Sequence, residues 1–266
     1  FRSLLMNTKR AVTVAGAHGK TTTSSMLAHI LTHAGEGNLA DPSYAIGGSI
    51  QGKDGMMLDG GHAGQGDVLV AEADESDGSF AKYHPEIAIV TNSEADHLDH
   101  YGTQENYRAA FVDHVQHAVK SVVMCGDDEG NLAVLRALDA SAAAHTVVYA
   151  TRDAASLGDL NGAAFVHIES ESESVQSGAE HFTLHVPAGL LCEQERMVSV
   201  TLAVPGIHNA RNASAAIIAA ALLGVDIEKA AEAATSFLGA VRRFQVRGTV
   251  SQVTVVDDYA HQDRKS

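Results

Sequence analysis

The stretch AVTVAGAHGKTTT, residues 11–23, decides the fold of this chain. It opens with a short apolar run typical of a buried strand, continues through a glycine-containing loop, and leads into TTTSSMLAHILTHAG, which has the pattern of a helix. Glycines let a backbone approach a polyphosphate closely, and the amide groups at a helix start point toward its oxygens. Lys20 can neutralise phosphate charge, and the Thr21 hydroxyl can bind a magnesium ion. Strand, loop, GKT and helix in this order predict a phosphate-binding loop in an α/β domain.

The loop is shorter than the standard phosphate-binding loop. The pattern GxxxxGK[ST] requires a glycine at position 14, where this chain has Val14, and its first glycine is Gly16, only three residues before Gly19. A glycine-rich turn with a solvated lysine is the alternative interpretation, and the order of the surrounding elements argues against it. The shortened form Gly-x-x-Gly-Lys-Thr therefore restricts the classes of nucleotide-binding protein to which the chain can belong.

Composition excludes several classes of protein. With 266 residues, 45% of them hydrophobic and 19% charged, the chain has the composition of a soluble globular protein of one large or two modest domains. Its net charge of -15 argues against nucleic acid or an anionic membrane surface as a partner. No apolar run approaches the roughly 20 residues of a membrane span, so we expect no membrane insertion. The spacing of Cys125 and Cys192, the two cysteines of the sequence, suits neither a zinc site nor a disulfide framework. The reducing cytoplasm is therefore the expected location. The sequence indicates no particular oligomeric state.

Apolar runs alternate with helical patterns over the first 150 residues. The expected strands are Ala11–Ala15, Asp67–Ala71, Ile87–Thr91, Ser121–Cys125 and His145–Ala150. The expected helices are Thr21–Ala34, Gln104–Val119 and Glu129–Leu138. This alternation indicates an α/β fold, a mostly parallel P-loop-type sheet flanked by helices.

The pattern changes between about residue 160 and residue 204, where AAFVHI, HFTLHV and MVSVTLAV predict a small antiparallel β patch. The polar, acidic segment ESESVQSGAE between the first two is expected to be an exposed loop. Two further helices are expected at Asn209–Leu223 and Ile227–Phe237. The predicted organisation is the end of an upstream segment (1–10), a central domain that carries the phosphate-binding loop (11–240) and the start of a truncated further domain with a new strand system (241–266).

Carboxylates follow two of the expected strands. Glu72-Ala73-Asp74 comes after VLVA, and Glu94-Ala95-Asp96, followed by His97, comes after IAIVTNS. Ligands of parallel α/β sheets bind at the carboxyl ends of the strands, and Mg²⁺ takes one or two carboxylates together with phosphate oxygens and waters. These residues therefore predict a magnesium site that faces the phosphate loop. The alternative is that the acids cap the following helices or turns. By residue type alone, His97 is better explained as a surface histidine.

Later polar residues are candidates for nucleotide contacts. Asn209 and Asn212 are three residues apart at the start of an alanine-rich helix, so they share a face of its first turn and can hydrogen-bond a purine edge. Plain N-capping is the alternative for both. Arg242-Arg243 can hold a phosphate through a bidentate contact. Asp258 follows the expected strand VTVV, where a carboxylate can bind a ribose diol or cap a turn.

Taken in order, the blocks GAHGKTTT, LVAEADESD, VTNSEADHLDHY, PGIHNARNA, RRFQ and VDDYAH resemble the signature blocks of the Mur ligases. They extend from residue 11 to residue 261, and their joint occurrence is far more specific than GKT alone. The resemblance implies a ligase that forms a C–N bond and uses ATP and Mg²⁺. The blocks are most similar to those of the members that join L-alanine to UDP-N-acetylmuramate through an acyl phosphate in cytoplasmic peptidoglycan synthesis.

The resemblance also assigns roles to individual positions. Lys20 corresponds to the lysine on the β- and γ-phosphates. Thr21 and Glu72 correspond to magnesium ligands, and His97 to a histidine associated with a second metal ion. The expected catalytic residues are therefore Lys20 and His97. The expected ATP-binding residues are Gly16, Ala17, His18, Gly19, Lys20, Thr21, Thr22, Asn209, Asn212, Arg243 and Asp258. Tyr259 and His261 match residues near the amino-acid site.

The chain departs from the family pattern in three ways. Ala17 stands where a threonine is usual, and Gln262 stands where another histidine is usual. The family's N-terminal domain, which holds the UDP group, and most of its C-terminal domain have no counterpart in the blocks above. We therefore expect the chain to be inactive alone, and a non-catalytic nucleotide-binding module is one alternative. Another Mur-type ligase, either a tripeptide-adding recycling ligase or a folylpolyglutamate synthase, is the other.

Overall fold

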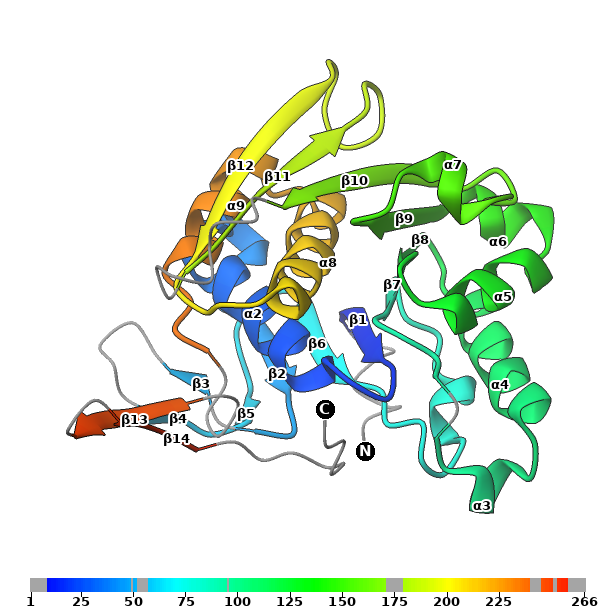
Figure 1. Cartoon of the computed structure of the whole chain (residues 1–266), viewed down its shortest axis with the longest axis horizontal. Coiled ribbons are helices and arrows are strands. Elements are labelled where there is room, and N and C mark those ends of the chain that lie inside the picture. The colour runs from blue at the N-terminus through cyan, green and yellow to red at the C-terminus, as the bar shows by residue number, and fades with distance from the viewer. Residues whose placement is uncertain are drawn as a thin grey trace.

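A computed structural model describes residues 9–48, 50–51, 57–94, 96–170, 179–239, 245–250 and 253–257. Its centre is a ten-stranded sheet with helices on both faces (Figure 1). The strand order is β12-β11-β10-β9-β8-β7-β1-β6-β2-β5. In that order the strands span Arg196–Leu202, Glu180–Val186, Ala164–Ser170, Thr146–Ala150, Ser121–Cys125, Ile87–Val90, Arg10–Ala15, Val68–Glu72, Ser43–Ala45 and Gly61–His62.

The first strand, β1, lies inside the parallel part of the sheet. It pairs with β6 on one side and with β7 on the other, and β8, β9 and β2 continue the parallel arrangement outward. The carboxyl ends of these strands consequently meet at one edge of the sheet, where ligands of such folds bind. The loop that follows β1 therefore lies between the segments that follow β6 and β7.

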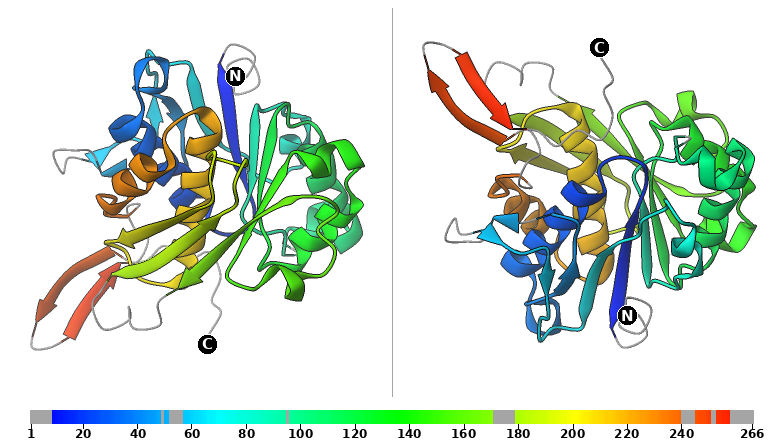
Figure 2. Two further views of the ribbon diagram at one scale, coloured as in Figure 1. Left: turned by 90° about the horizontal axis from the view of Figure 1, so that it is seen from above. Right: turned by 90° about the horizontal axis from the view of Figure 1, so that it is seen from below.

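Helices cover the two faces of the sheet as separate layers (Figure 2). One layer consists of α2 (Lys20–Ala34), α8 (Ile207–Leu223) and α9 (Ile227–Thr235), which pack against one another. The other layer contains α4 (Gln104–Gln116) and α5 (Glu129–Ala137). Short helical turns connect the strands: α3 (Leu98–Tyr101), α6 (Ala140–Ala144), α7 (Ala154–Leu157), η1 (Gly37–Leu39) and η2 (Ser79–Lys82). Within the described part of the chain, none of the helices has the length and apolarity needed to cross a membrane.

Each helical layer encloses its own hydrophobic core. Successive side chains of β1 point to opposite faces of the sheet and so contribute to both cores. Val12 and Val14 pack under α2 and α8, whereas Ala15 belongs to the core under α4 and α5. Strands that are buried on both faces read as continuous apolar runs, which is the pattern of VLVA in β6 and IAIV in β7. These runs are the reason that the parallel strands could be found in the sequence.

The predicted antiparallel patch is confirmed. β10, β11 and β12 pair antiparallel and extend the sheet beyond β9. In β11 every second residue is buried, because only the face toward α8 and α9 is covered. One covered face gives the strict alternation that the sequence displays.

Several short elements were not predicted. These are β2 and β5, the pair β3 (Ile50–Gln51) and β4 (Met57–Leu58), and the helical turns α3, α6 and α7. Residues 245–250 and 253–257, in the region where a new strand system was expected, form an antiparallel pair, β13 (Gln245–Val250) and β14 (Val253–Asp257). Helix α8 begins at Ile207, two residues before the expected start. The short strands escape prediction because strands of two or three residues are too short to show a period and are held by pairing with distant neighbours such as β6.

Candidate functional site

The loop between β1 and α2 has a backbone conformation that demands glycine. Gly16 has φ 134° and Gly19 has φ 85°, a range that residues with a Cβ rarely adopt. A Cβ on Gly16 would also lie 2.3 Å from Thr91 Oγ1 and 2.7 Å from the Asn92 carbonyl oxygen. The loop is therefore packed directly against the segment that follows β7, with Lys20 as the first residue of α2.

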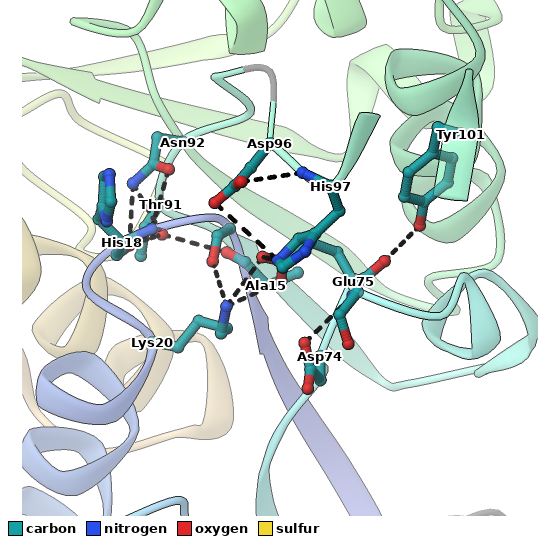
Figure 3. Close-up of polar contacts among 12 residues, drawn as sticks. Ala15, His18, Lys20, Asp74, Glu75, Thr91, Asn92, Asp96, His97 and Tyr101 are labelled. Atoms are coloured by element: carbon teal, nitrogen blue, oxygen red, sulfur yellow. Dashed lines mark hydrogen bonds and ion pairs between the residues drawn. The ribbon is translucent and has the colours of Figure 1, made fainter. Parts of the chain in front are cut away.

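Thr91 and Asn92 hold the loop by hydrogen bonds to its backbone (Figure 3). The Thr91 hydroxyl lies 2.6 Å from the His18 carbonyl oxygen and 3.1 Å from that of Ala15. The Asn92 side chain donates to the His18 carbonyl at 2.8 Å and accepts from the His18 amide at 3.1 Å. The sequence did not single out these two residues. Their position at the carboxyl end of an apolar run was the signal that could have found them.

Lys20 makes its contacts inside the site. Its Nζ donates to the Gly16 carbonyl at 2.7 Å and to both carboxylate oxygens of Glu75, at 2.8 Å and 3.0 Å. Glu75 is 1% exposed. Burial raises the pKa of Glu75, and the neighbouring ammonium of Lys20 counteracts this only in part. Glu75 was also missed, because the EADESD block offers four acids and spacing alone does not show which one turns toward the lysine.

Glu72 and Thr21 both lie next to the segment formed by Gly47 and Gly48. The Glu72 carboxylate accepts the Gly47 amide at 2.8 Å, and the Ser24 hydroxyl lies 3.5 Å from the same oxygen. A Cβ on Gly48 would lie 3.0 Å from the Thr21 side chain. The donors here are oxygens, as Mg²⁺ prefers, and a magnesium ion needs only one or two protein groups when phosphates and waters complete its shell. The described residues contain no group of three or more His, Cys, Asp or Glu side chains arranged to hold a metal ion.

His97 lies next to Glu75, the carboxylate that binds Lys20. Its Nε2 is 3.9 Å from a Glu75 carboxylate oxygen and 3.9 Å from one of Asp96. His97 has φ 50° and precedes α3 directly. Tyr101, at the end of this helix, donates its hydroxyl hydrogen to the Glu75 carbonyl (Figure 3). The structure therefore brings the expected catalytic residues, Lys20 and His97, to one carboxylate.

The two asparagines of α8 play different structural roles. Asn212 is next to the loop: its Oδ1 accepts the Thr23 hydroxyl at 3.2 Å, and a Cβ on Gly19 would lie 2.7 Å from that same oxygen. Asn209 donates to the Pro205 carbonyl at 2.7 Å and so closes the turn before the helix. Both are 8% exposed.

The remaining predicted residues are of two kinds. Ala17 and Thr22 are half-buried around the loop, and His18 is exposed. Arg243, Asp258, Tyr259 and His261 lie outside the described residues. Their predicted roles at the nucleotide and the amino-acid substrate stay predictions.

An ion pair between a partly exposed arginine and a buried carboxylate, which the sequence did not reveal, fixes the start of α8. Arg211 Nε donates to Asp127 at 2.7 Å, and Asp127 follows β8 and is 5% exposed. Asp127 also accepts the backbone amide and the hydroxyl of Thr151, each at 2.9 Å. Burial by itself would raise the pKa of Asp127, but the Thr151 donors and Arg211 together hold it below its usual value. The pair joins β8 and β9 to the helix that carries Asn209 and Asn212.

Taken together, this geometry can bind a polyphosphate. A glycine-rich backbone, the N-terminus of a 15-residue helix and one lysine converge at the carboxyl end of the sheet. Oxygen donors on neighbouring segments supply places for a divalent cation.

Comparison with known proteins identifies a family with these features. The family profile of the Mur ligase middle domain matches residues 14–220. The chain is 82% identical over 259 residues to the UDP-N-acetylmuramate--L-alanine ligase of Bifidobacterium adolescentis, and 67% identical over 259 residues to that of Bifidobacterium longum. Each alignment covers 97% of this chain and 50% of the relative. The chain thus spans about half the length of these relatives.

Solved structures agree with this comparison. The UDP-N-acetylmuramate-alanine ligase MurC from Thermotoga maritima superposes with a TM-score of 0.74 at 28% identity, covering 98% of this chain and 53% of that one. A murein peptide ligase from Psychrobacter arcticus superposes with a TM-score of 0.68 at 24% identity, over 96% of this chain and 52% of the other, which demonstrates a shared fold.

Proposed function

The chain belongs to the Mur ligase family, and we propose that it is the ATP-binding core of a ligase that joins L-alanine to UDP-N-acetylmuramate in cytoplasmic peptidoglycan synthesis. The observation that carries the proposal is the convergence of Lys20, the glycine loop and the start of α2 at the carboxyl end of β1. A loop of this kind binds the phosphates of ATP. The two substrates in the proposal are those in the names of the relatives described above.

In the proposed reaction, the carboxylate of UDP-N-acetylmuramate takes the γ-phosphoryl group, and the amine of L-alanine then displaces phosphate to form the amide. Phosphoryl transfer asks a protein mainly for positioning and for stabilisation of charge. Lys20 and the amides at the start of α2 would hold the negative charge of the group in transit. Thr91 and Asn92 would keep the loop backbone in place, because their hydrogen bonds fix the His18 carbonyl.

Thr21 and Glu72 are the residues that would hold Mg²⁺, and His97, 3.9 Å from Glu75, would assist a second ion. A bound magnesium ion would neutralise phosphate charge. Glu72 is fixed for this role by the Gly47 amide, which orients its carboxylate beside the loop.

The proposal is tested in a chimera, since the chain covers half of its relatives. The matching 259 residues of the Bifidobacterium adolescentis ligase are exchanged for those of this chain, and ADP release is measured with UDP-N-acetylmuramate and L-alanine. Lys20→Ala should abolish turnover. Lys120→Ala, which removes an exposed lysine paired with Glu86, is the matched control and should retain it. Near-normal turnover of the Lys20 variant would refute the proposal.

The same assay separates the family members. Alanine, glycine, serine and a tripeptide are offered in turn as the amine substrate. Preference for alanine supports the proposed member, whereas preference for the tripeptide would favour a recycling ligase.

A second candidate function, nucleotide binding without turnover, follows from the coverage of about half of each relative. We propose this as the behaviour of the isolated chain. Calorimetry with ATP-Mg²⁺ and with UDP-N-acetylmuramate tests it, and tight binding of the uridine nucleotide would contradict it.

A further inference from the structure

Glu75 binds the ammonium group of Lys20, the same group that a bound phosphate would need. Both of its carboxylate oxygens accept from Lys20 Nζ, and the Gly16 carbonyl accepts from the same atom. The exposed fractions of the two side chains are 17% for Lys20 and 1% for Glu75. Lys20 is thus engaged within the protein and does not extend into solvent.

The position of Glu75 is fixed by its neighbours. The Tyr101 hydroxyl and the Gly78 amide both donate to the Glu75 carbonyl, so the backbone on which the carboxylate stands is anchored from α3 and from the following turn. His97 lies 3.9 Å from the carboxylate. Because the carboxylate is buried, water cannot replace Lys20 as its partner without a rearrangement.

A polyphosphate in this loop would compete with Glu75 for Lys20. It would also bring negative charge close to a buried carboxylate, where electrostatic interactions are only weakly screened. Resting on the nucleotide-binding function proposed above, we propose that Glu75 is a positioning residue that holds Lys20 in the empty loop and gives up this contact when phosphates bind. The affinity of the loop for phosphate is then lowered by the energy of the Lys20–Glu75 contact.

A purely structural brace would behave in the opposite way. If Glu75 only supported the loop, its removal would loosen the loop and weaken phosphate binding. The two roles therefore differ in the sign of the change in affinity, and Glu75→Gln distinguishes them because it removes the charge and keeps the shape.

The test is calorimetric titration of the chain with magnesium-free inorganic tripolyphosphate. We expect Glu75→Gln to bind this probe about threefold to tenfold more tightly than the wild type, as a charged hydrogen bond no longer competes. Glu86→Gln is the matched control. Glu86 accepts from Arg10 and Lys120 just before β7 begins, at the end of that strand away from the phosphate loop. The Glu86 substitution should therefore leave the affinity for tripolyphosphate unchanged.

Two comparisons keep the outcomes distinct. Binding of the probe by the wild type, together with equal or weaker binding by Glu75→Gln, overturns the role of Glu75 and leaves the proposed function standing. Failure of both proteins to bind overturns the proposed function and, with it, the role of Glu75.

A second measurement needs no substitution at Glu75. In ¹⁵N-lysine spectra of the wild type, the ammonium signal of Lys20, assigned with Lys20→Gln, should be protected from exchange in the empty chain and should shift when tripolyphosphate is added. A bound probe that leaves this signal unchanged would show that Lys20 stays with Glu75, and would refute the inference.

Discussion

Asn212, in the second turn of α8, lies against Gly19 of the phosphate loop, although the two residues are far apart in the chain. A Cβ on Gly19 would be 2.7 Å from Asn212 Oδ1, which also accepts the Thr23 hydroxyl. The loop and α8 are thus in direct contact, and a methyl group on Gly19 would push the Asn212 side chain away from Thr23. Any change at Gly19 acts on both the loop and the helix.

Gly19→Ala should therefore be more damaging than its backbone conformation alone explains. Gly162→Ala is the matched control, because Gly162 has φ 83°, close to the 85° of Gly19, but a Cβ added there would meet no atom within 4 Å. We expect the control to lose about 1 kcal/mol of unfolding free energy, and Gly19→Ala to lose about 1–3 kcal/mol more through overpacking. Urea denaturation measures both, and equal losses would contradict the contact.

His114 provides a prediction about pH. It is fully buried on α4, where Nδ1 donates to the Phe80 carbonyl at 2.9 Å and Nε2 is 3.1 Å from the Thr13 hydroxyl. Burial lowers the pKa of His114 to about 4 from its ordinary value of 6.5. The folded state thus keeps a neutral ring while the unfolded chain takes up a proton. Stability should be full above the unfolded pKa and should fall by on the order of 3 kcal/mol as the pH drops from about 6.5 to about 4.

His114→Gln isolates this contribution. The variant should be less stable at neutral pH, because two buried hydrogen bonds are disturbed, but its stability should depend less on pH between those two values. His145→Gln replaces an exposed histidine and should keep the slope of the wild type. Unfolding free energies at several pH values provide the comparison. A slope that His114→Gln leaves unchanged would contradict the assignment.

The parallel strands and the loop could be predicted because their signals are local. IAIV and VLVA are apolar runs buried on both faces, and Gly16 to Thr21 carries its chemistry in six consecutive residues. The family and the fold class followed from such blocks and are confirmed. The antiparallel patch was visible for the same reason, since one covered face imposes alternation on β11.

The contacts that shape the site could not be predicted, because they join residues that are far apart in the chain. Which acid of EADESD meets Lys20 depends on the turn after β6, and spacing does not encode it. The pairing of Asp127 with Arg211 needs the order of β8, β9 and α8 in space. Thr91 and Asn92 were overlooked because neutral side chains that bind backbone leave no charge pattern.

Asp127 provides a second pH prediction, in a different range. Its pKa in the folded protein is lowered from the ordinary value of 3.8: burial opposes the shift, and the Thr151 donors and Arg211 outweigh it. Its contribution to stability should be full above the unfolded pKa and lost as the pH falls through the lower folded pKa. We expect Asp127→Asn to cost about 1–2 kcal/mol at neutral pH, since Arg211 is partly exposed and solvent screens the pair.

The stability difference between the wild type and Asp127→Asn should shrink as the pH falls below about 4, because the wild-type carboxylate then takes up a proton and loses the charge that the variant already lacks. Unfolding of the two proteins by urea across this range provides the measurement. A difference that stays constant down to the lowest pH would show that Asp127 does not act through its charge. Asp153→Asn, at a more exposed carboxylate, is the control and should have little effect.

Glu72 should matter for nucleotide binding only when magnesium is present. Its carboxylate is oriented by the Gly47 amide beside Thr21, so Glu72→Gln keeps a similar shape but removes the negative charge that attracts a divalent cation. We expect the affinity for ATP-Mg²⁺ to fall about tenfold to a hundredfold, the usual effect of disturbing a metal site, while the affinity for magnesium-free ATP stays within about twofold. Calorimetry with and without the ion measures both quantities. Glu86→Gln, remote from the loop, should change neither, and an equal loss in both titrations would mean that Glu72 supports the loop and not the metal ion.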